Sequence, residues 1–77
     1  MINGDQCRMA RAALRWSAAE LGKVAGVGLS TVQRFERGGG LQGRNLAAIQ
    51  KAFEEAGVQF IPENGGGVGV RLRDRED

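Results

Sequence analysis

Apolar residues recur at every third or fourth position over most of the chain, the spacing that lines up one face of an α-helix. The first such segment, about residues 4–14, opens with Asn3 and Gln6 at the spacing of a capping box. Its inward positions are predicted to be Cys7, Ala10, Ala13 and Leu14. We interpret Cys7 as a core residue and not as a reactive thiol, and a single cysteine cannot form an internal disulfide.

Two short helices are predicted between residues 17 and 38, joined by a Gly-Val-Gly turn at residues 26–28. Ser17 and Glu20 have the spacing of a second capping box, and Gly26 suits the left-handed conformation that ends a helix. The positions expected to face inward are Leu21, Val24 and Ala25 in the first helix and Leu29, Val32 and Phe35 in the second. Two short amphipathic helices joined by a tight turn are the layout of a helix-turn-helix motif.

The outward face of the second of these helices carries side chains that suit nucleic acid. Arg34 is the main candidate for base recognition, because arginine can donate two hydrogen bonds to O6 and N7 of guanine. Ser30 and Gln33 are the next candidates for base contacts. Thr31 fits a base or phosphate contact, or a purely structural place at the start of the helix. The expected partner of this face is double-stranded DNA.

A fourth helix is predicted over about residues 44–56, after a glycine-rich loop. Gly57 suits the position that ends this helix. The predicted inward positions are Leu46, Ile49, Ala52, Phe53 and Ala56.

The pattern changes at Val58 to the alternation of a half-buried strand, first over residues 58–61 and again over residues 68–73. Asn64-Gly65 between the two runs signals a turn, which predicts a β-hairpin or an exchanged strand. An apolar set on these runs exceeds what a small helical domain readily covers and is expected to form a dimer contact: Phe60, Val68, Val70 and Leu72. The alternative folds the hairpin onto its own fourth helix and leaves a monomer. Truncation after Gly57 is expected to leave a folded, monomeric helical domain.

Charge and composition narrow the function. The net charge of the 77 residues is only +2, but residues 1–40 hold most of the excess of basic over acidic side chains, as a phosphate-facing surface requires. A solvated basic face without a partner is the alternative. The chain has no His, no Tyr and one Cys, and no paired carboxylates at catalytic spacing, so we expect no enzyme, metal or cofactor. With no apolar run of about 18 residues and no signal peptide, we expect a cytoplasmic protein that does not enter a membrane.

Two short motifs, Glu20-Leu21-Gly22 and Glu36-Arg37-Gly38, stand at the separation found in the Cro/repressor-like (Xre) helix-turn-helix family, which the chain resembles over about residues 5–58. The resemblance implies that Arg11 pairs with Glu36 as a brace between the first helix and the end of the recognition helix. It also implies DNA backbone contacts by Arg37 and Arg44, although a solvated charge at the start of a helix is the alternative for Arg44. Ser17 and Thr31 are further candidates for backbone contacts. Two departures are Ala18, where many members have a phosphate-binding Gln, and Gly22, where they have Ala.

The expected fold class is therefore mostly α, a repressor-like domain of four to five helices with a C-terminal β-hairpin or strand. Residues 1–57 would form the DNA-binding domain, residues 58–73 the dimerisation element, and residues 74–77 a disordered acidic tail. The expected function is a sequence-specific transcriptional regulator, a homodimeric repressor that inserts the helix of about residues 29–37 into the major groove of an operator. The alternative is an antitoxin that binds a toxin protein through its C-terminal strand and acidic tail and also represses its own operon.

Overall fold

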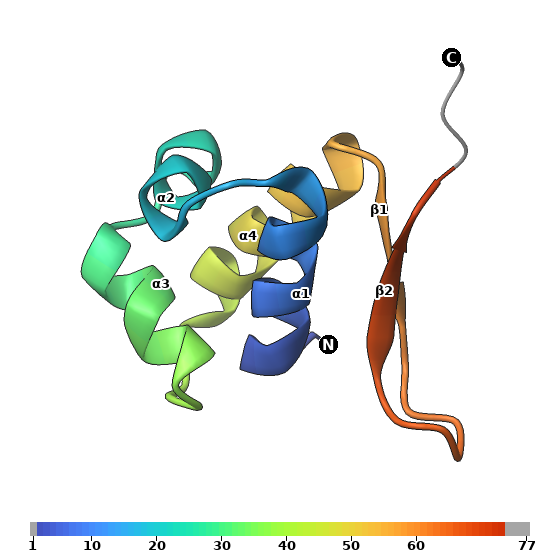
Figure 1. The fold of residues 1–77 in the computed structure, drawn as a ribbon. Coiled ribbons are helices and arrows are strands. Elements are labelled where there is room, and N and C mark those ends of the chain that lie inside the picture. Colours follow the sequence, from blue (N-terminus) through green and yellow to red (C-terminus); the bar gives the residue numbers. More distant parts are fainter. Residues whose placement is uncertain (1, 74–77) are drawn as a thin grey trace.

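The computed structural model describes residues 2–73, and its chain folds as helices followed by a β-hairpin (Figure 1). The helices are α1 (Gly4–Leu14), α2 (Ala18–Ala25), α3 (Leu29–Glu36) and α4 (Gly43–Glu55), and the strands are β1 (Val58–Ile61) and β2 (Gly69–Leu72). This architecture confirms the expected fold class, with four helices in the described part of the chain. The expected acidic tail, residues 74–77, lies outside the described residues.

Local sequence signals account for the helix ends. Both predicted capping boxes form, Asn3 with Gln6 at the start of α1 and Ser17 with Glu20 at the start of α2. Gly26 ends α2 with φ 73°, the left-handed conformation in which glycine carries no steric penalty. Arg15 ends α1 with φ 59°, a conformation that is uncommon for a residue with a Cβ atom.

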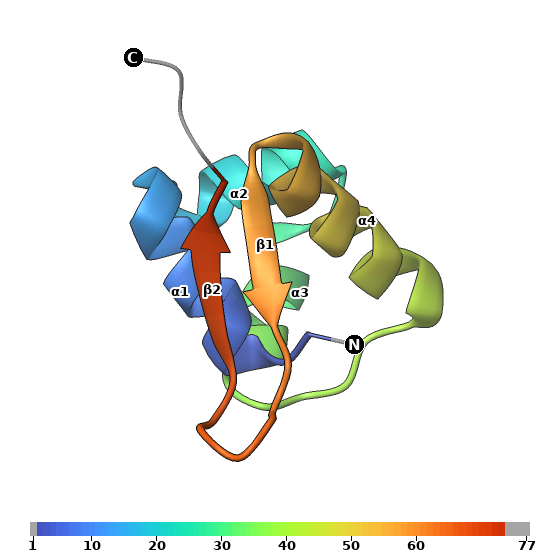
Figure 2. The same cartoon turned by 90° about the vertical axis from the view of Figure 1, so that its right-hand side faces the viewer.

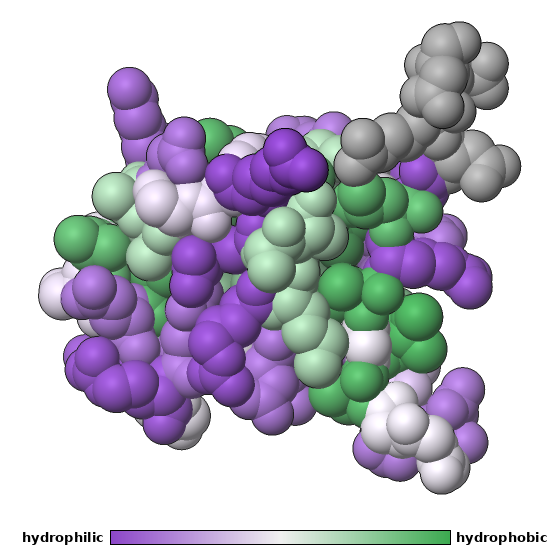
Figure 3. Space-filling model, viewed as in Figure 1, coloured by the Kyte–Doolittle hydropathy of each residue, from purple (hydrophilic) through white to green (hydrophobic). Residues whose placement is uncertain are grey.

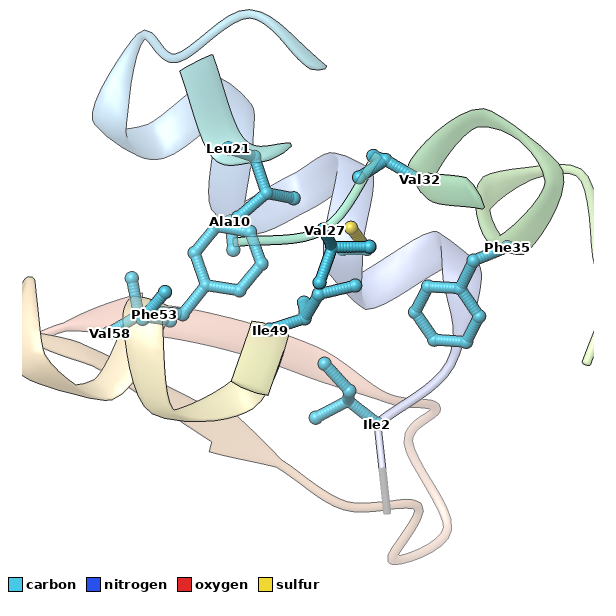
Figure 4. Close-up of a cluster of buried hydrophobic side chains, with 11 residues drawn as sticks. Ile2, Ala10, Leu21, Val27, Val32, Phe35, Ile49, Phe53 and Val58 are labelled. Atoms are coloured by element: carbon cyan, nitrogen blue, oxygen red, sulfur yellow. The ribbon is translucent and has the colours of Figure 1, made fainter. Parts of the chain in front are cut away.

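The core lies between the four helices and the hairpin (Figure 4). Phe53 of α4 is fully buried, stacks on Trp16 with ring centroids 5.8 Å apart, and meets Phe60 of β1 edge-on at 5.9 Å. Trp16 therefore anchors the connection between α1 and α2 to the core. The buried apolar residues are Ile2, Cys7, Ala10, Leu21, Val27, Val32, Phe35, Ile49, Ala52, Phe53 and Val58.

Three positions expected to face inward do not. Val24 is 57% exposed and Leu29 is 45% exposed. In α2 the inward face is set by Leu21 and Gly22, which rotates Val24 toward solvent. Leu29 begins α3 and lies to the side of the face that buries Val32 and Phe35. Ala56 is exposed because α4 ends at Glu55, one residue before it.

The hairpin packs on its own chain. Its strands pair antiparallel with Val58 opposite Leu72 and Phe60 opposite Val70, and Figure 2 shows β2 crossing in front of α1. Gln6, itself buried, donates from Nε2 to the carbonyl oxygens of Ile61 and Gly69, both at 3.1 Å. The hairpin is thereby fixed to α1 as well as to α4.

This packing changes the interpretation of the residues expected at a dimer contact. Phe60, Val70 and Leu72 are half-buried and pack against the core of their own chain. Val68 is half-buried in the connection between the strands. Phe60, Val70 and Leu72 are therefore partly covered by their own chain, which packs the hairpin on both α1 and α4. A dimer contact through these three residues and Val68 stays a prediction.

Candidate nucleic-acid interface

The corner between α2 and α3 is held by close backbone packing. The Val27 N–H donates to the Gly22 carbonyl oxygen at 2.9 Å, and the N–H groups of Thr31 and Val32 in α3 donate to the Gly28 carbonyl oxygen, both at 3.1 Å. A Cβ atom on Gly22 would lie 2.5 Å from the Val27 carbonyl oxygen. Glycine at this position, where the sequence departs from the family pattern, therefore suits the tight approach of the turn to α2.

Opposite the buried face of α3, its polar side chains point to solvent. Ser30, Gln33, Arg34 and Arg37 are exposed and Thr31 is half-buried. Within residues 2–73 these five side chains form no hydrogen bond or ion pair with the rest of the chain. The polar face of α3 can therefore hydrogen-bond a partner without first breaking contacts of its own.

The glycine loop after α3 closes against the stem of Arg34. The Gly39 N–H donates to the Arg34 carbonyl oxygen at 2.9 Å. A Cβ atom on Gly39 would lie 2.7 Å from Arg34 Cγ, so a larger residue here would displace that side chain. The sequence predicted only a loop at this position, and its role in placing Arg34 depends on a contact that periodicity does not reveal.

The end of α3 is fixed to α1 through Glu36. Arg11 binds both carboxylate oxygens, Nε to Oε2 and Nη2 to Oε1, each at 2.7 Å, and its Nη1 donates to the Trp16 carbonyl oxygen at 3.1 Å. Cys7 Sγ donates to Glu36 Oε2 at 3.1 Å, and Arg8 Nη1 donates to the Glu36 carbonyl oxygen. The Arg11–Glu36 pair that the resemblance implied is thus present, with two further donors from the same turn of α1.

Electrostatics in this cluster favour an ionised Glu36 and a neutral Cys7. Burial raises the pKa of Glu36, but the hydrogen bonds from Arg11 and Cys7 and the positive charges of Arg11 and Arg8 outweigh it, so the pKa is lowered overall. Burial, followed by the hydrogen bond to Glu36, raises the pKa of the Cys7 thiol far above its ordinary value. The thiol is therefore a buried donor, in agreement with the interpretation of Cys7 as a core residue.

A glycine allows α1 and α3 to meet. A Cβ atom on Gly4 would lie 2.4 Å from the Phe35 carbonyl oxygen and 3.0 Å from Glu36 Cα. The sequence analysis missed this contact, and also the roles of Arg8 and of Gln6 toward the hairpin. No local signal identifies them, because each depends on a partner at least 28 residues away in the chain.

The expected backbone contacts lie at helix ends. Ser17 is the exposed N-cap of α2, where its hydroxyl oxygen accepts from the Glu20 N–H at 3.0 Å. Arg37 is exposed directly after α3, and Arg44 is exposed in the first turn of α4, on the other side of the glycine loop. The hairpin lies at the opposite end of the molecule from α3 (Figure 1).

A helix pair with this turn, an exposed polar second helix and a braced C-terminal end defines a helix-turn-helix domain. The Helix-turn-helix family model matches residues 8–57, and the chain belongs to this family, in its Cro/Xre-type branch. Members of the family are DNA-binding transcription regulators. No curated protein matches the chain. Within residues 2–73 no helix combines the length and apolar character needed to cross a bilayer.

Proposed function

We propose that this chain is a sequence-specific repressor that inserts α3 into the major groove of an operator. The observation that supports this most is the outward face of α3, whose exposed polar side chains have no partner within residues 2–73. The opposite face of α3 is buried, and Glu36 ties its end to α1. A helix held in this way can present side chains to base edges with little loss of conformational freedom.

The roles within this proposal follow from side-chain chemistry. Arg34 would bind O6 and N7 of a guanine, and Ser30 and Gln33 would make the neighbouring base contacts. Ser17, Thr31, Arg37 and Arg44 would contact phosphates, which fix the register of the protein on the duplex. Neither an enzymatic reaction nor a cofactor enters the proposal.

Two copies on a palindromic operator complete the proposal, each placing one α3 in a half-site about one turn of DNA apart. Support comes from the two-stranded sheet, in which each strand has one edge that pairs with no other strand of residues 2–73. Sedimentation of the free full chain should give a dimer, and sedimentation on a duplex with two half-sites should give two chains per duplex. A full chain that sediments as a monomer, or one chain per duplex, would contradict the dimer.

The antitoxin alternative depended on a C-terminal strand and an acidic tail that are free to contact a toxin. The strand pairs within the hairpin and packs on α1 and α4, and residues 74–77 lie outside the described residues. No feature of residues 2–73 favours a toxin partner, and the operator-binding function is the one that we propose.

Selection of bound fragments from genomic DNA tests the function. We expect one sequence motif to be enriched strongly over unrelated DNA. Gln33→Ala should change the enriched motif at one position, because Gln33 faces outward from α3. Gln59→Ala is the matched control, an exposed glutamine on the distant hairpin, and should enrich the wild-type motif. Failure of the wild-type chain to enrich any motif would contradict the proposal.

A further inference from the structure

An exposed apolar side chain begins the recognition helix. Three large hydrophobic residues are exposed in the described part of the chain, Met9, Val24 and Leu29. Two of them, Val24 and Leu29, belong to the helix-turn-helix, and Figure 3 shows a hydrophobic area at its left edge, over the corner where α2 meets α3. A single exposed leucine is ordinary on a protein surface. What distinguishes Leu29 is its position at the start of the second helix of the motif.

Leu29 is the first residue of α3, and it follows an N-cap residue, Gly28, that has no side chain. Gly28 therefore has no side chain that could cover Leu29. Leu29 is 45% exposed, next to Ser30 and one helical turn before Gln33, so the three side chains lie on adjoining parts of one surface. Helix-turn-helix proteins contact base edges with the N-terminal residues of the second helix.

The major groove offers one apolar group to such a side chain, the C5-methyl group of thymine. We propose that Leu29 determines part of the operator sequence by packing on a thymine methyl group, beside the hydrogen bonds made by Ser30 and Gln33. This inference rests on the proposed function, because it assigns a base preference to the same surface of α3. It also gives the uncovered surface of Leu29 an occupant that removes it from water.

Val24 supplies a matched comparison. It is more exposed than Leu29, at 57%, but it lies on α2, and the first helix of such a motif crosses the DNA backbone instead of entering the groove. Loss of the Val24 side chain removes a similar apolar surface without removing a base contact. Since neither residue belongs to the core, both positions can be truncated in a folded chain.

The experiment uses the operator obtained by selection and replaces each thymidine in turn with deoxyuridine, which removes only the methyl group. For the wild-type chain we expect about fourfold weaker binding at one or two positions per half-site, the equivalent of ~0.8 kcal/mol for one buried methylene. At those positions, Leu29→Ala and Leu29→Gln should bind the thymidine duplex and the deoxyuridine duplex with equal affinity. Val24→Ala should keep the wild-type sensitivity.

The outcomes separate this inference from the proposed function. Suppose that the wild-type chain selects an operator, but that every deoxyuridine substitution weakens the binding of the wild-type chain and of Leu29→Ala to the same extent. The proposed contact of Leu29 with a thymine methyl group would then be wrong, while DNA recognition would stand. An operator without thymine in its half-sites would overturn the role equally. If the wild-type chain selects no operator, the proposed function itself fails.

Discussion

Removal of the Glu36 carboxylate should destabilise the fold by far more than removal of an ordinary surface charge. The side chain of Glu36 is 9% exposed and that of Arg11 is 22% exposed. Glu36→Ala leaves the Arg11 guanidinium and the Cys7 thiol without their acceptor. Breaking a buried ion pair from one side costs about 3–5 kcal/mol. Because part of Arg11 reaches water, we expect the lower end, about 3 kcal/mol.

For a domain of this size, each kcal/mol lowers the melting temperature by about 4–8 °C. Glu36→Ala should therefore melt roughly 12–24 °C below the wild-type chain, followed by circular dichroism. Glu55→Ala is the matched control, since Glu55 is 70% exposed and stands 4.0 Å from Lys51 on α4. Its cost should stay below about 1 kcal/mol. If Glu36→Ala costs no more than Glu55→Ala, the pair with Arg11 is only a surface contact.

The same pair predicts an acid-dependent loss of stability. A carboxyl group whose pKa is lower in the folded than in the unfolded chain stabilises the fold above its unfolded pKa, and this contribution disappears as the pH falls through the folded value. The pKa of Glu36 lies below its ordinary value of 4.5 because the bonds from Arg11 and Cys7 outweigh its burial. The free energy of unfolding of the wild-type chain should decrease as the pH is lowered below about 4.5. The free energy of unfolding of Glu36→Ala should lack this acid-dependent decrease. If the free energy of unfolding depends on pH in the same way in both proteins, the lowered pKa of Glu36 would be contradicted.

Three further predictions follow from contacts at other places in the fold. Gly4→Ala should destabilise the chain by about 1–3 kcal/mol in urea unfolding, because the new methyl group would overlap the Phe35 carbonyl oxygen, whereas Gly43→Ala at the open start of α4 should be neutral or stabilising; equal effects would refute the close approach. Gln6→Ala should speed hydrogen exchange in the hairpin, because two carbonyl oxygens lose their donor, and protection equal to that of wild type would refute the link. Truncation after Gly57 should abolish cooperative unfolding, because it removes the buried Val58 and uncovers Phe53; a truncated chain that stays folded would instead support the expectation from the sequence.

Sequence signals of short range were sufficient for most of the secondary structure. The capping boxes placed the starts of α1 and α2 correctly, because such a box depends on residues three positions apart. Helices α2 and α3 are each only eight residues long. Because eight residues make only about two helical turns, the spacing of apolar residues left their inward face ambiguous. Val24 and Leu29 were accordingly assigned to the wrong side.

Contacts between distant segments could not be predicted in this way. The alternation after Val58 predicted the strands, but it gave no information on the surface that the hairpin would cover. That surface depends on Gln6, which lies 55 residues before Ile61 in the chain. The Arg11–Glu36 pair is the exception, since it came from the resemblance to a family and not from spacing.

The central claim, that the outward face of α3 reads DNA sequence, is tested most directly by binding titrations of the wild-type chain and Arg34→Ala at one salt concentration. Each protein is titrated with the selected operator and with a scrambled duplex of the same composition. We expect Arg34→Ala to lose about 1–3 kcal/mol on the operator and little on the scrambled duplex, because a base contact is lost while phosphate contacts remain. An operator preference that is the same in both proteins would contradict the account.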